Sequence, residues 1–374
     1  MNKEYNLFGK VLEVLEDYPA HQLDEKFIQE TFKTIEHVFD AFFLNVNELS
    51  FEEERHFVKF YFTSDRQEEL EKTIKLYDDV CVALETKDVR AYFDKNQNRV
   101  CFEVPKKDFY TIGAKKLFEK MTDNDEGLKA LIGIANDHLI CHDFCQNPNL
   151  LIAGNTGSGK TVLINQIVLS LISKYSPEIL KIALIDLKQV EFEYFSDLPH
   201  LENGMIIRDN EEIISYMEAL CKEEENNLKL FKQNGVSDID EYNKKAIEQG
   251  LPIKQKTVVV FDEFADVIVS NYARYEKLLK TLVEKGGKSG VYLILSTQCP
   301  TKNILSFEGN EKFSRVCLRV PTITNSKNVL GVHGAERLIG KGDLLYLQEN
   351  GSVVRGASSY ISAKEIKDVV NLIK

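Results

Sequence analysis

The residues with the clearest chemical signature form one complete G-x-x-x-x-G-K-T segment: Gly154, Asn155, Thr156, Gly157, Ser158, Gly159, Lys160 and Thr161. An apolar run precedes the segment and a helical pattern follows it, which is the strand–loop–helix context of a phosphate-binding loop. In such a loop backbone N–H groups turn toward phosphates, Lys160 reaches the β- and γ-phosphates, and the Thr161 hydroxyl holds Mg²⁺. The segment together with Val162 predicts a site for ATP and Mg²⁺. The alternative is a flexible glycine loop with an incidental lysine.

Two adjacent carboxylates, Asp262 and Glu263, follow another apolar run, residues 257–261. Acids at the end of a buried strand suit two roles in phosphoryl transfer, because one can hold the Mg²⁺ shell while its neighbour polarises the attacking water. We therefore expect Asp262 to hold the metal ion and Glu263 to be the catalytic base. An acid pair at a strand end is also a common exposed feature.

Other polar residues near strand ends give weaker signals. Gln298 ends the run 291–298 where the sheet would meet the γ-phosphate, so it is either a catalytic sensor of the nucleotide or an ordinary polar terminus. Four potential zinc ligands have a spacing that matches no standard zinc pattern, in a stretch that alternates like a strand: His138, Cys141, His142 and Cys145. We expect no zinc site there, and a packing or turn role for His200.

The elements that must position these residues read as alternating strands and helices. Continuous apolar runs, separated by helical stretches, occur at 149–154, 181–187, 257–264 and 291–298. Strands that are apolar throughout and alternate with helices indicate a parallel sheet covered on both faces. We predict that this α/β core with a parallel-rich central sheet occupies residues 147–374.

A smaller α+β domain is expected before this core, over residues 1–146. Apolar residues at helical spacing predict helices over 22–43 and 66–84, and alternation predicts a strand over 56–63. Residues 89–94 and 99–105 read as a hairpin around Asn96, Gln97 and Asn98. No linker rich in proline or glycine marks the boundary near Asn147 and Pro148.

The composition is that of a soluble globular protein, since 43% of the 374 residues are hydrophobic and 28% are charged, which excludes disorder and collagen. No run approaches the ~18 to 20 consecutive apolar residues of a membrane helix, and acids interrupt the opening apolar stretch, which excludes a signal peptide. The seven cysteines are odd in number and scattered, which favours reduced thiols. We expect a cytoplasmic chain with no membrane insertion of its own.

The formal net charge of −12 argues against a nucleic-acid-binding protein, but this charge is unevenly distributed. Lys and Arg counted against Asp and Glu give −11 for residues 1–150, −7 for 151–250 and +6 for 251–374. A basic segment on an acidic chain is either an electrostatic footprint for a phosphate backbone or ordinary solvated surface.

Further segments resemble the FtsK/SpoIIIE family of DNA translocases, and the likeness runs from roughly residue 35 to the C-terminus. Beyond the phosphate loop, 185–188 is similar to the family's I-D-P-K, 198–201 to I-P-H-L, 260–266 to V-D-E-F-A-D, 296–300 to A-T-Q-R-P and 334–343 to G-A-E-x-L-L-G-x-G-D. The resemblance implies a RecA-like core, hexameric rings with ATP hydrolysis at subunit interfaces, and duplex DNA in a central channel. It also implies that residues 89–105 and 131–140 belong to the smaller domain.

The chain departs from the family where three arginines are expected. Thr281 and Cys299 stand at two of these places, and the family's A-R-A-A-G is Gly-Gly-Lys-Ser-Gly at 286–290. Arg315, in a segment similar to the family's P-x-R-I, is the candidate for the arginine that acts in trans. The resemblance also gives expected DNA contacts in and after the channel loops: Lys288, Lys302 and Lys312. The family's membrane span and winged-helix module have no counterpart in the sequence, which leaves room for a separate membrane-anchored partner.

Three functions remain open from the sequence. The leading interpretation is an ATP-hydrolysing double-stranded DNA translocase, or a DNA-transfer coupling ATPase, that works as a ring with sequence-independent phosphate contacts. The second is a protein-export ATPase, since some family members serve secretion systems and the acidic smaller domain offers a docking surface. The third is a nucleotide-dependent assembly protein with weak hydrolysis, which the missing arginines favour.

Overall fold

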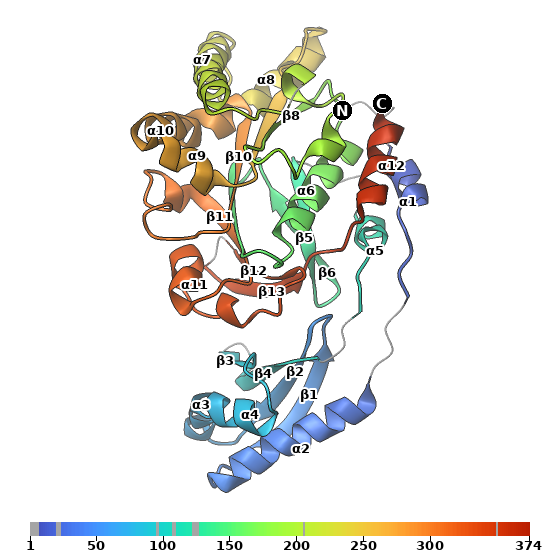
Figure 1. The fold of residues 1–374 in the computed structure, drawn as a ribbon, viewed down its shortest axis with the longest axis vertical. Coiled ribbons are helices and arrows are strands. Elements are labelled where there is room, and N and C mark those ends of the chain that lie inside the picture. The colour runs from blue at the N-terminus through green and yellow to red at the C-terminus, as the bar shows by residue number, and fades with distance from the viewer. Residues whose placement is uncertain are drawn as a thin grey trace.

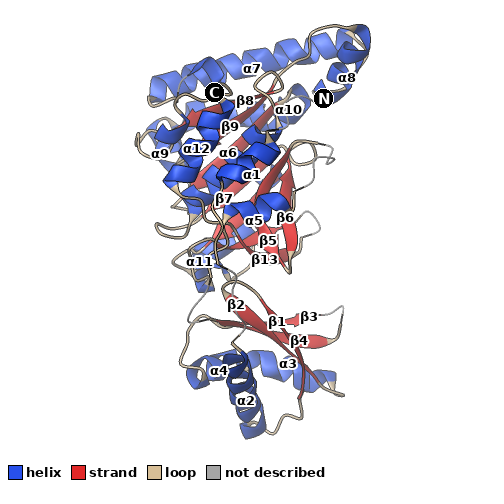
Figure 2. Cartoon of the chain, turned by 90° about the vertical axis from the view of Figure 1, so that its right-hand side faces the viewer, coloured by secondary structure: helices blue, strands red, loops and turns tan. Residues whose placement is uncertain are grey.

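The computed structural model describes residues 7–19, 24–94, 97–106, 110–121, 127–204, 206–348 and 351–374. The described chain contains one β-sheet of four strands and one of nine, and the smaller sheet lies at one end of an elongated molecule (Figure 1). Helices cover both faces of the larger sheet, and α7 and α8 lie at the end farthest from the smaller sheet (Figure 2).

The larger sheet combines a parallel half with an antiparallel half. Its strands, in their order across the sheet, are β6 (His138–Asp143), β5 (Lys129–Ala135), β13 (Val353–Ala357), β12 (Asp343–Leu347), β11 (Phe313–Leu318), β7 (Asn149–Ala153), β10 (Val291–Thr297), β9 (Lys256–Phe261) and β8 (Leu180–Ile185). The last five strands pair in parallel, and the first five pair antiparallel with one another. The predicted parallel strands are confirmed, and the sheet as a whole is partly parallel, because its other half pairs antiparallel.

Alternate residues of the parallel strands feed two apolar cores. Ile152 and Ile294 belong to one core, and Leu151 and Leu293 belong to the core on the opposite face. The first core is covered by α1 (Phe8–Val14), α5 (Ala114–Glu119), α6 (Lys160–Lys174) and α12 (Ala363–Ile373). The second is covered by α7 (Asn210–Gln233), α9 (Phe264–Ser270), α10 (Tyr272–Ser289) and α11 (Ile323–Leu330), and α8 (Ile239–Gln249) follows α7. Because both faces are buried, these strands are apolar throughout.

Four short 3₁₀ helices occur in the connections of the described chain: η1 (Glu193–Phe195), η2 (Glu202–Gly204), η3 (Asn310–Lys312) and η4 (Ala335–Arg337).

The four-stranded unit, residues 24–106, is antiparallel throughout, in the order β1 (Asn47–Glu53), β2 (Phe57–Thr63), β4 (Arg99–Pro105) and β3 (Arg90–Asp94). Its helices are α2 (Glu25–Ala41), α3 (Gln67–Lys75) and α4 (Tyr77–Ala83). An aromatic cluster of Phe32, Phe39, Phe62 and Phe102 fills its core. The expected strand and hairpin are confirmed, the helix expected over 66–84 is two helices, and Gln22 and Asn96 lie outside the described residues.

The path of the chain does not follow the boundary that we expected after residue 146. Helix α1 packs against α12, the last helix, so the described part of the chain starts in the larger unit, continues in the four-stranded unit and then returns. Strands β5 and β6 pair with each other, and β5 joins β13 through Ile134 and Ala357. Residues 131–140 therefore lie in the larger sheet, contrary to the expectation from the resemblance. Where the chain divides into independently folding domains stays a prediction.

Candidate functional site

The phosphate loop lies between β7 and α6, at the carboxyl ends of the parallel strands. Its backbone needs glycine at two positions, because Gly157 has a φ of 77° and Gly159 a φ of 100°. A Cβ atom on Gly159 would also lie 2.6 Å from the backbone nitrogen of Gly342. Helix α6 begins at Lys160, and the first N–H groups of a helix have no partner within it. The loop can therefore present backbone donors and the positive end of a helix dipole to a phosphate.

Lys160 is held where a phosphate would need it. Its side chain is 5% exposed, and Nζ donates to the backbone oxygen of Asp262 (2.9 Å) and to Oγ of Ser296 (2.8 Å). Both partners stand at the carboxyl ends of parallel strands, in β10 and directly after β9. Lys160 therefore lies next to Asp262, the first residue of the acid pair.

Asp262 has the properties of a ligand for a cation. Its Oδ1 is buried, accepts no hydrogen bond from any described residue, and lies 3.5 Å from Nζ of Lys160. Burial raises the pKa of this carboxyl, and the nearby ammonium group opposes the increase. A buried carboxylate oxygen without a hydrogen bond fits a divalent cation beside the phosphate loop, where Thr161 supplies a hydroxyl.

Glu263 is oriented by the strand next to it. Thr297 Oγ1 donates to Oε1 of Glu263 (2.7 Å), and the backbone N–H of Gln298 donates to Oε2 (2.9 Å). The Gln298 side chain accepts a 2.9 Å hydrogen bond from Thr156 of the phosphate loop. One chain of hydrogen bonds therefore links the expected base, the expected sensor and the loop.

Glu191 is a site residue that sequence reasoning missed. Asp186 accepts hydrogen bonds from four successive backbone N–H groups, those of residues 188–191, and this turn brings Glu191 beside the phosphate loop. Burial and the nearby Asp262 raise the pKa of the Glu191 carboxyl, whereas Lys160 and a hydrogen bond with the Thr161 hydroxyl oppose the increase. The sequence held one signal for Glu191. It is an acid three residues after Lys188, the last residue of the segment similar to I-D-P-K.

Arg319 was also missed, whereas Arg315 was expected. The backbone oxygen of Arg319 accepts from the N–H of Asn155 (2.9 Å), and its side chain lines a small cavity beside Asn155 and Gly157. Arg315 instead donates to the backbone oxygens of Val329 (2.6 Å) and Asn310 (3.1 Å). These bonds hold Arg315 within its own chain, and its action in trans stays a prediction.

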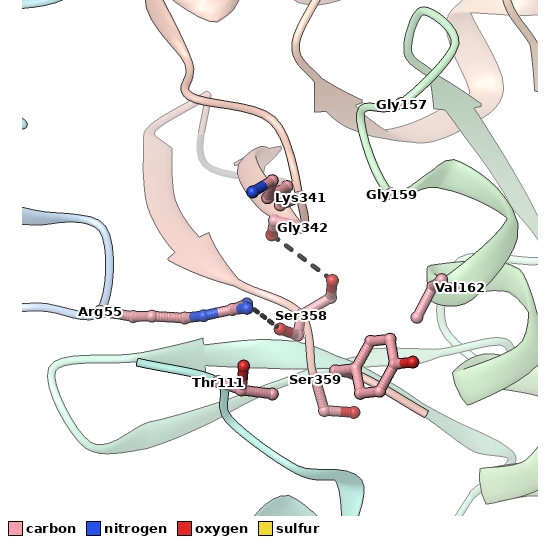
Figure 3. Close-up of a pocket in the computed structure, with 10 residues that line it drawn as sticks. Arg55, Thr111, Gly157, Gly159, Val162, Lys341, Gly342, Ser358 and Ser359 are labelled. Carbon is pink, nitrogen blue, oxygen red and sulfur yellow. Dashed lines mark hydrogen bonds between the residues drawn. The ribbon is translucent and has the colours of Figure 1, made fainter. Parts of the chain in front are cut away.

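A cavity of about 640 Å³ opens beside the phosphate loop (Figure 3). It is lined by Arg55, Thr111, Gly157, Gly159, Val162, Lys341, Gly342, Ser358, Ser359 and Tyr360. Arg55 reaches it from the four-stranded unit and donates to the backbone oxygen of Ser358 (2.9 Å). The cavity therefore joins the phosphate loop to residues from distant parts of the chain, including the predicted Val162.

The three lysines expected to contact DNA are exposed but lie at two edges of the sheet. Lys288 lies in the last turn of α10, just before β10, and Lys312 directly precedes β11, so both are at the amino ends of parallel strands. Lys302 follows the carboxyl end of β10, and the seven-residue strand between the edges spans roughly 20 Å. A single chain does not gather them into one patch, and their contact with DNA stays a prediction.

The weaker sequence signals have structural explanations. His142 is buried against Phe144, whereas Cys141 projects from the other face of β6, and the described residues contain no cluster of three or more metal-ligating groups. His200 is buried, with Nε2 2.7 Å from the backbone oxygen of Tyr175, as a packing residue. All seven cysteines are free thiols.

Comparison with known proteins agrees with this geometry. Residues 119–302, which include the phosphate loop, the acid pair and Gln298, match the model of the FtsK/SpoIIIE family. The chain is similar to a DNA translocase FtsK of Streptococcus pyogenes serotype M3 (strain SSI-1), with 31% identity over 96% of this chain. It spans only 46% of that relative's length.

Solved structures show the same fold. The monomer form of the pCW3 conjugation coupling protein TcpA with ATPγS matches 92% of this chain and all of its own, with a TM-score of 0.62 and 19% identity. The cytoplasmic domain of the Thermomonospora curvata type VII secretion ATPase EccC matches 68% of this chain and 32% of its own, with a TM-score of 0.59 and 24% identity. These likenesses confirm the predicted RecA-like core.

The described ranges contain no helix with both the length and the apolar character needed to cross a membrane. The family match covers the segment that carries the phosphate loop, Asp262, Glu263 and Gln298, and the similarity to the streptococcal translocase extends along nearly the whole chain. Residues 119–302 therefore carry the FtsK/SpoIIIE family match, and the chain as a whole is similar to DNA translocases FtsK.

Proposed function

We propose that this chain is an ATPase that moves double-stranded DNA, as a translocase or as the coupling ATPase of a DNA-transfer system. The observation that carries the proposal is the arrangement of Lys160, Asp262 and Glu263 at the carboxyl edge of the parallel strands. Lys160 follows β7, the two acids follow β9, and β10 between these strands holds both Lys160 and Glu263 through Ser296 and Thr297. A buried lysine between a phosphate loop and an acid pair is the set of groups that catalyses transfer of a phosphoryl group from a nucleotide to water.

ATP would span the loop and the neighbouring cavity. The triphosphate would be held by the backbone donors of the loop and by Lys160, and the cavity of about 640 Å³ has the size of a small-molecule site. The exposed side of Tyr360 offers a stacking surface for a base, and Thr111 and Ser359 offer polar groups to a ribose.

Mg²⁺ would be held by the Thr161 hydroxyl and by Asp262, whose Oδ1 accepts no hydrogen bond from the described residues. A bound Mg²⁺ would neutralise charge on the β- and γ-phosphates. Glu263, fixed by Thr297 and by the N–H of Gln298, would accept a proton from the attacking water.

Gln298 would report the state of the γ-phosphate, because it contacts both the loop residue Thr156 and, through its backbone, Glu263. A hexameric ring would bring an arginine of a neighbouring subunit to this site, and Arg315 is our candidate. Such an arginine would stabilise charge in the transition state.

The DNA substrate is supported by the family and by the basic segment 251–374. Lys288, Lys302 and Lys312 would contact phosphates without reading sequence. We propose that the ring works in the cytoplasm, where it can act with a separate membrane-anchored partner.

A protein-export ATPase is the second candidate, because the secretion ATPase EccC shares the fold. In that case the acidic four-stranded unit would dock a protein. The third interpretation, an assembly protein with weak hydrolysis, predicts nucleotide binding with little turnover.

The deciding experiment measures the ATPase rate of the full chain with and without long linear duplex DNA, over a series of salt concentrations. Particle size is measured in parallel with ATPγS. A DNA motor shows stimulation that falls as salt rises, together with ring-sized particles. Turnover that ignores DNA at low salt favours protein export, and binding without single-turnover hydrolysis favours the assembly protein.

A further inference from the structure

Four charged side chains meet where the four-stranded unit contacts the larger sheet. Arg355 in β13, with 2% of its side chain exposed, donates from Nε (3.0 Å) and Nη2 (2.6 Å) to the two carboxylate oxygens of Asp343. Its Nη1 donates to Oε2 of Glu103 in β4 (2.8 Å), which also accepts from Arg90 in β3 (2.9 Å). One guanidinium thus joins carboxylates from the two sheets.

The charges in this cluster depend on one another. Burial acts to raise the pKa of Glu103, but Arg90 and Arg355 outweigh burial, so that the pKa is lowered. Burial likewise acts against the charged form of Asp343, and Arg355 outweighs it, so that this pKa is lowered too. Removal of one partner leaves an uncompensated buried charge, which makes the cluster sensitive to whether the units are docked.

Asp343 connects the cluster to the phosphate loop. Its Oδ2 accepts from the N–H of Ile339 (2.9 Å), which fixes the turn 339–343. In that turn the N–H of Gly342 donates to the backbone oxygen of Ser158 (2.8 Å). The close approach of Gly342 to Gly159 makes the turn one wall of the loop.

A second connection runs in parallel. Arg55 of the four-stranded unit donates from Nε to the backbone oxygen of Tyr110 (2.8 Å) and from Nη1 to that of Ser358 (2.9 Å). The N–H of Ser358 donates to the backbone oxygen of Gly342 (2.9 Å), and Figure 3 shows Arg55, Ser358 and Gly342 side by side in the cavity wall.

We propose that Arg355 is a positioning residue for the phosphate loop, which it holds through Asp343 and the turn 339–343, and that Glu103 makes this positioning depend on docking of the four-stranded unit. The inference rests on the proposed nucleotide site. By linkage, a nucleotide on the loop stabilises the docked unit as strongly as docking raises nucleotide affinity.

The test measures backbone hydrogen exchange of the full chain with and without ATPγS, and the Kd for ATPγS. The variant Glu103→Gln keeps the shape but removes the charge shared by two arginines. Arg355→Lys keeps the charge but loses the planar fork that reaches both carboxylates. The matched control is Asp94→Asn, which breaks the 3.0 Å ion pair with Arg99 inside the four-stranded unit and leaves Glu103 intact.

In the wild type we expect ATPγS to slow exchange at 154–161 and also in β4. In Glu103→Gln and Arg355→Lys we expect the Kd to rise about fivefold or more and the slowing in β4 to vanish. The double variant Glu103→Gln/Arg355→Lys should bind ATPγS no more weakly than either single variant, because both substitutions break the same connection. Asp94→Asn should change the Kd less than about twofold.

The experiment separates failure of the positioning role from failure of the proposed nucleotide site. If ATPγS slows exchange at 154–161 but not in wild-type β4, or if the slowing in β4 survives Glu103→Gln, the positioning role is wrong while the nucleotide site stands. If exchange at 154–161 ignores ATPγS, the proposed function is wrong, and the positioning role falls with it. The wild-type measurement decides this without any variant that has to fold.

Discussion

Thr156 Oγ1 donates a 2.9 Å hydrogen bond to Oε1 of Gln298, so that the tip of the phosphate loop contacts the end of β10. The backbone N–H of Gln298 donates in turn to Glu263. A change at the γ-phosphate that moves Thr156 therefore shifts Glu263, the proposed base, through these two hydrogen bonds.

Gln298→Ala breaks this connection and leaves Lys160 and its contacts in place. We expect kcat to fall at least about tenfold while ATP affinity stays within about threefold, since Gln298 orients groups that act in the transition state. Steady-state ATPase rates and fluorescence titration with a nucleotide analogue measure the two quantities. Cys299→Ala, an exposed neighbour, is the control and should match the wild type. An unchanged kcat in Gln298→Ala would remove the sensor role.

Lys160→Ala and Glu263→Gln should separate binding from chemistry. Without Lys160 the loop loses its buried cation, and we expect ATP binding to be abolished. Glu263→Gln keeps an acceptor for Thr297 but cannot take a proton, so ATP should bind while turnover falls by about 10² or more. Isothermal titration and single-turnover hydrolysis make the distinction, with Lys229→Ala and Glu225→Gln on α7 as matched controls. Normal hydrolysis in Glu263→Gln would shift the role of the base to another carboxylate, such as Asp266.

Glu191→Gln tests the carboxylate that the sequence did not reveal. Its charge adds to that of Asp262 beside Thr161, where a divalent cation would be held. We expect the Mg²⁺ concentration needed for half-maximal ATPγS binding to rise about fivefold, the equivalent of roughly 1 kcal/mol. Binding without Mg²⁺ should not weaken, because one negative charge near the phosphates is lost. Glu193→Gln, in the nearby ion pair with Arg208, is the control. An unchanged Mg²⁺ requirement would contradict the role.

The strands that carry the site could be predicted because each is buried on both faces and reads as a continuous apolar run. The same reasoning could not place α1 on α12 or join β5 to β13, since these contacts connect residues more than a hundred positions apart and depend on tertiary packing. Glu191 was missed for a related reason. Its position depends on a turn closed by the Asp186 side chain, and neither residue has a distinctive periodicity.

Lys288 and Lys312 lie at one edge of the sheet and Lys302 at the other, so their contacts with DNA can be tested separately. The slope of log affinity against log salt reports the number of phosphates that the protein neutralises. We expect this number to fall by about two in the double variant Lys288→Ala/Lys312→Ala and by about one in Lys302→Ala, whatever the DNA sequence. Basal ATPase should survive, and the triple variant should lose stimulation by DNA. Replacement of Lys26, Lys72 and Lys75 in the four-stranded unit removes the same charge and should leave the slope unchanged. If the parent binds DNA and the triple variant keeps its affinity and slope, the assignment of these lysines is wrong.

Buried histidines predict a loss of stability in mild acid. Burial lowers the pKa of His56 to about 3 and those of His142 and His200 to about 4, against an ordinary value of 6.5. Between these values the unfolded chain binds protons that the folded chain does not, so the free energy of unfolding decreases as the pH falls below 6.5.

Glu224 acts in the opposite direction, because burial raises its pKa to about 8, so the test compares variants rather than the wild-type curve alone. His200→Gln keeps a donor near the backbone oxygen of Tyr175 and cannot titrate. From pH 7.5 to 5.5 the wild type should lose about 1 kcal/mol more than His200→Gln in urea unfolding, because one histidine no longer takes up a proton on unfolding. The exposed His333→Asn should follow the wild type. Parallel curves for wild type and His200→Gln would show that His200 is not held neutral in the folded protein.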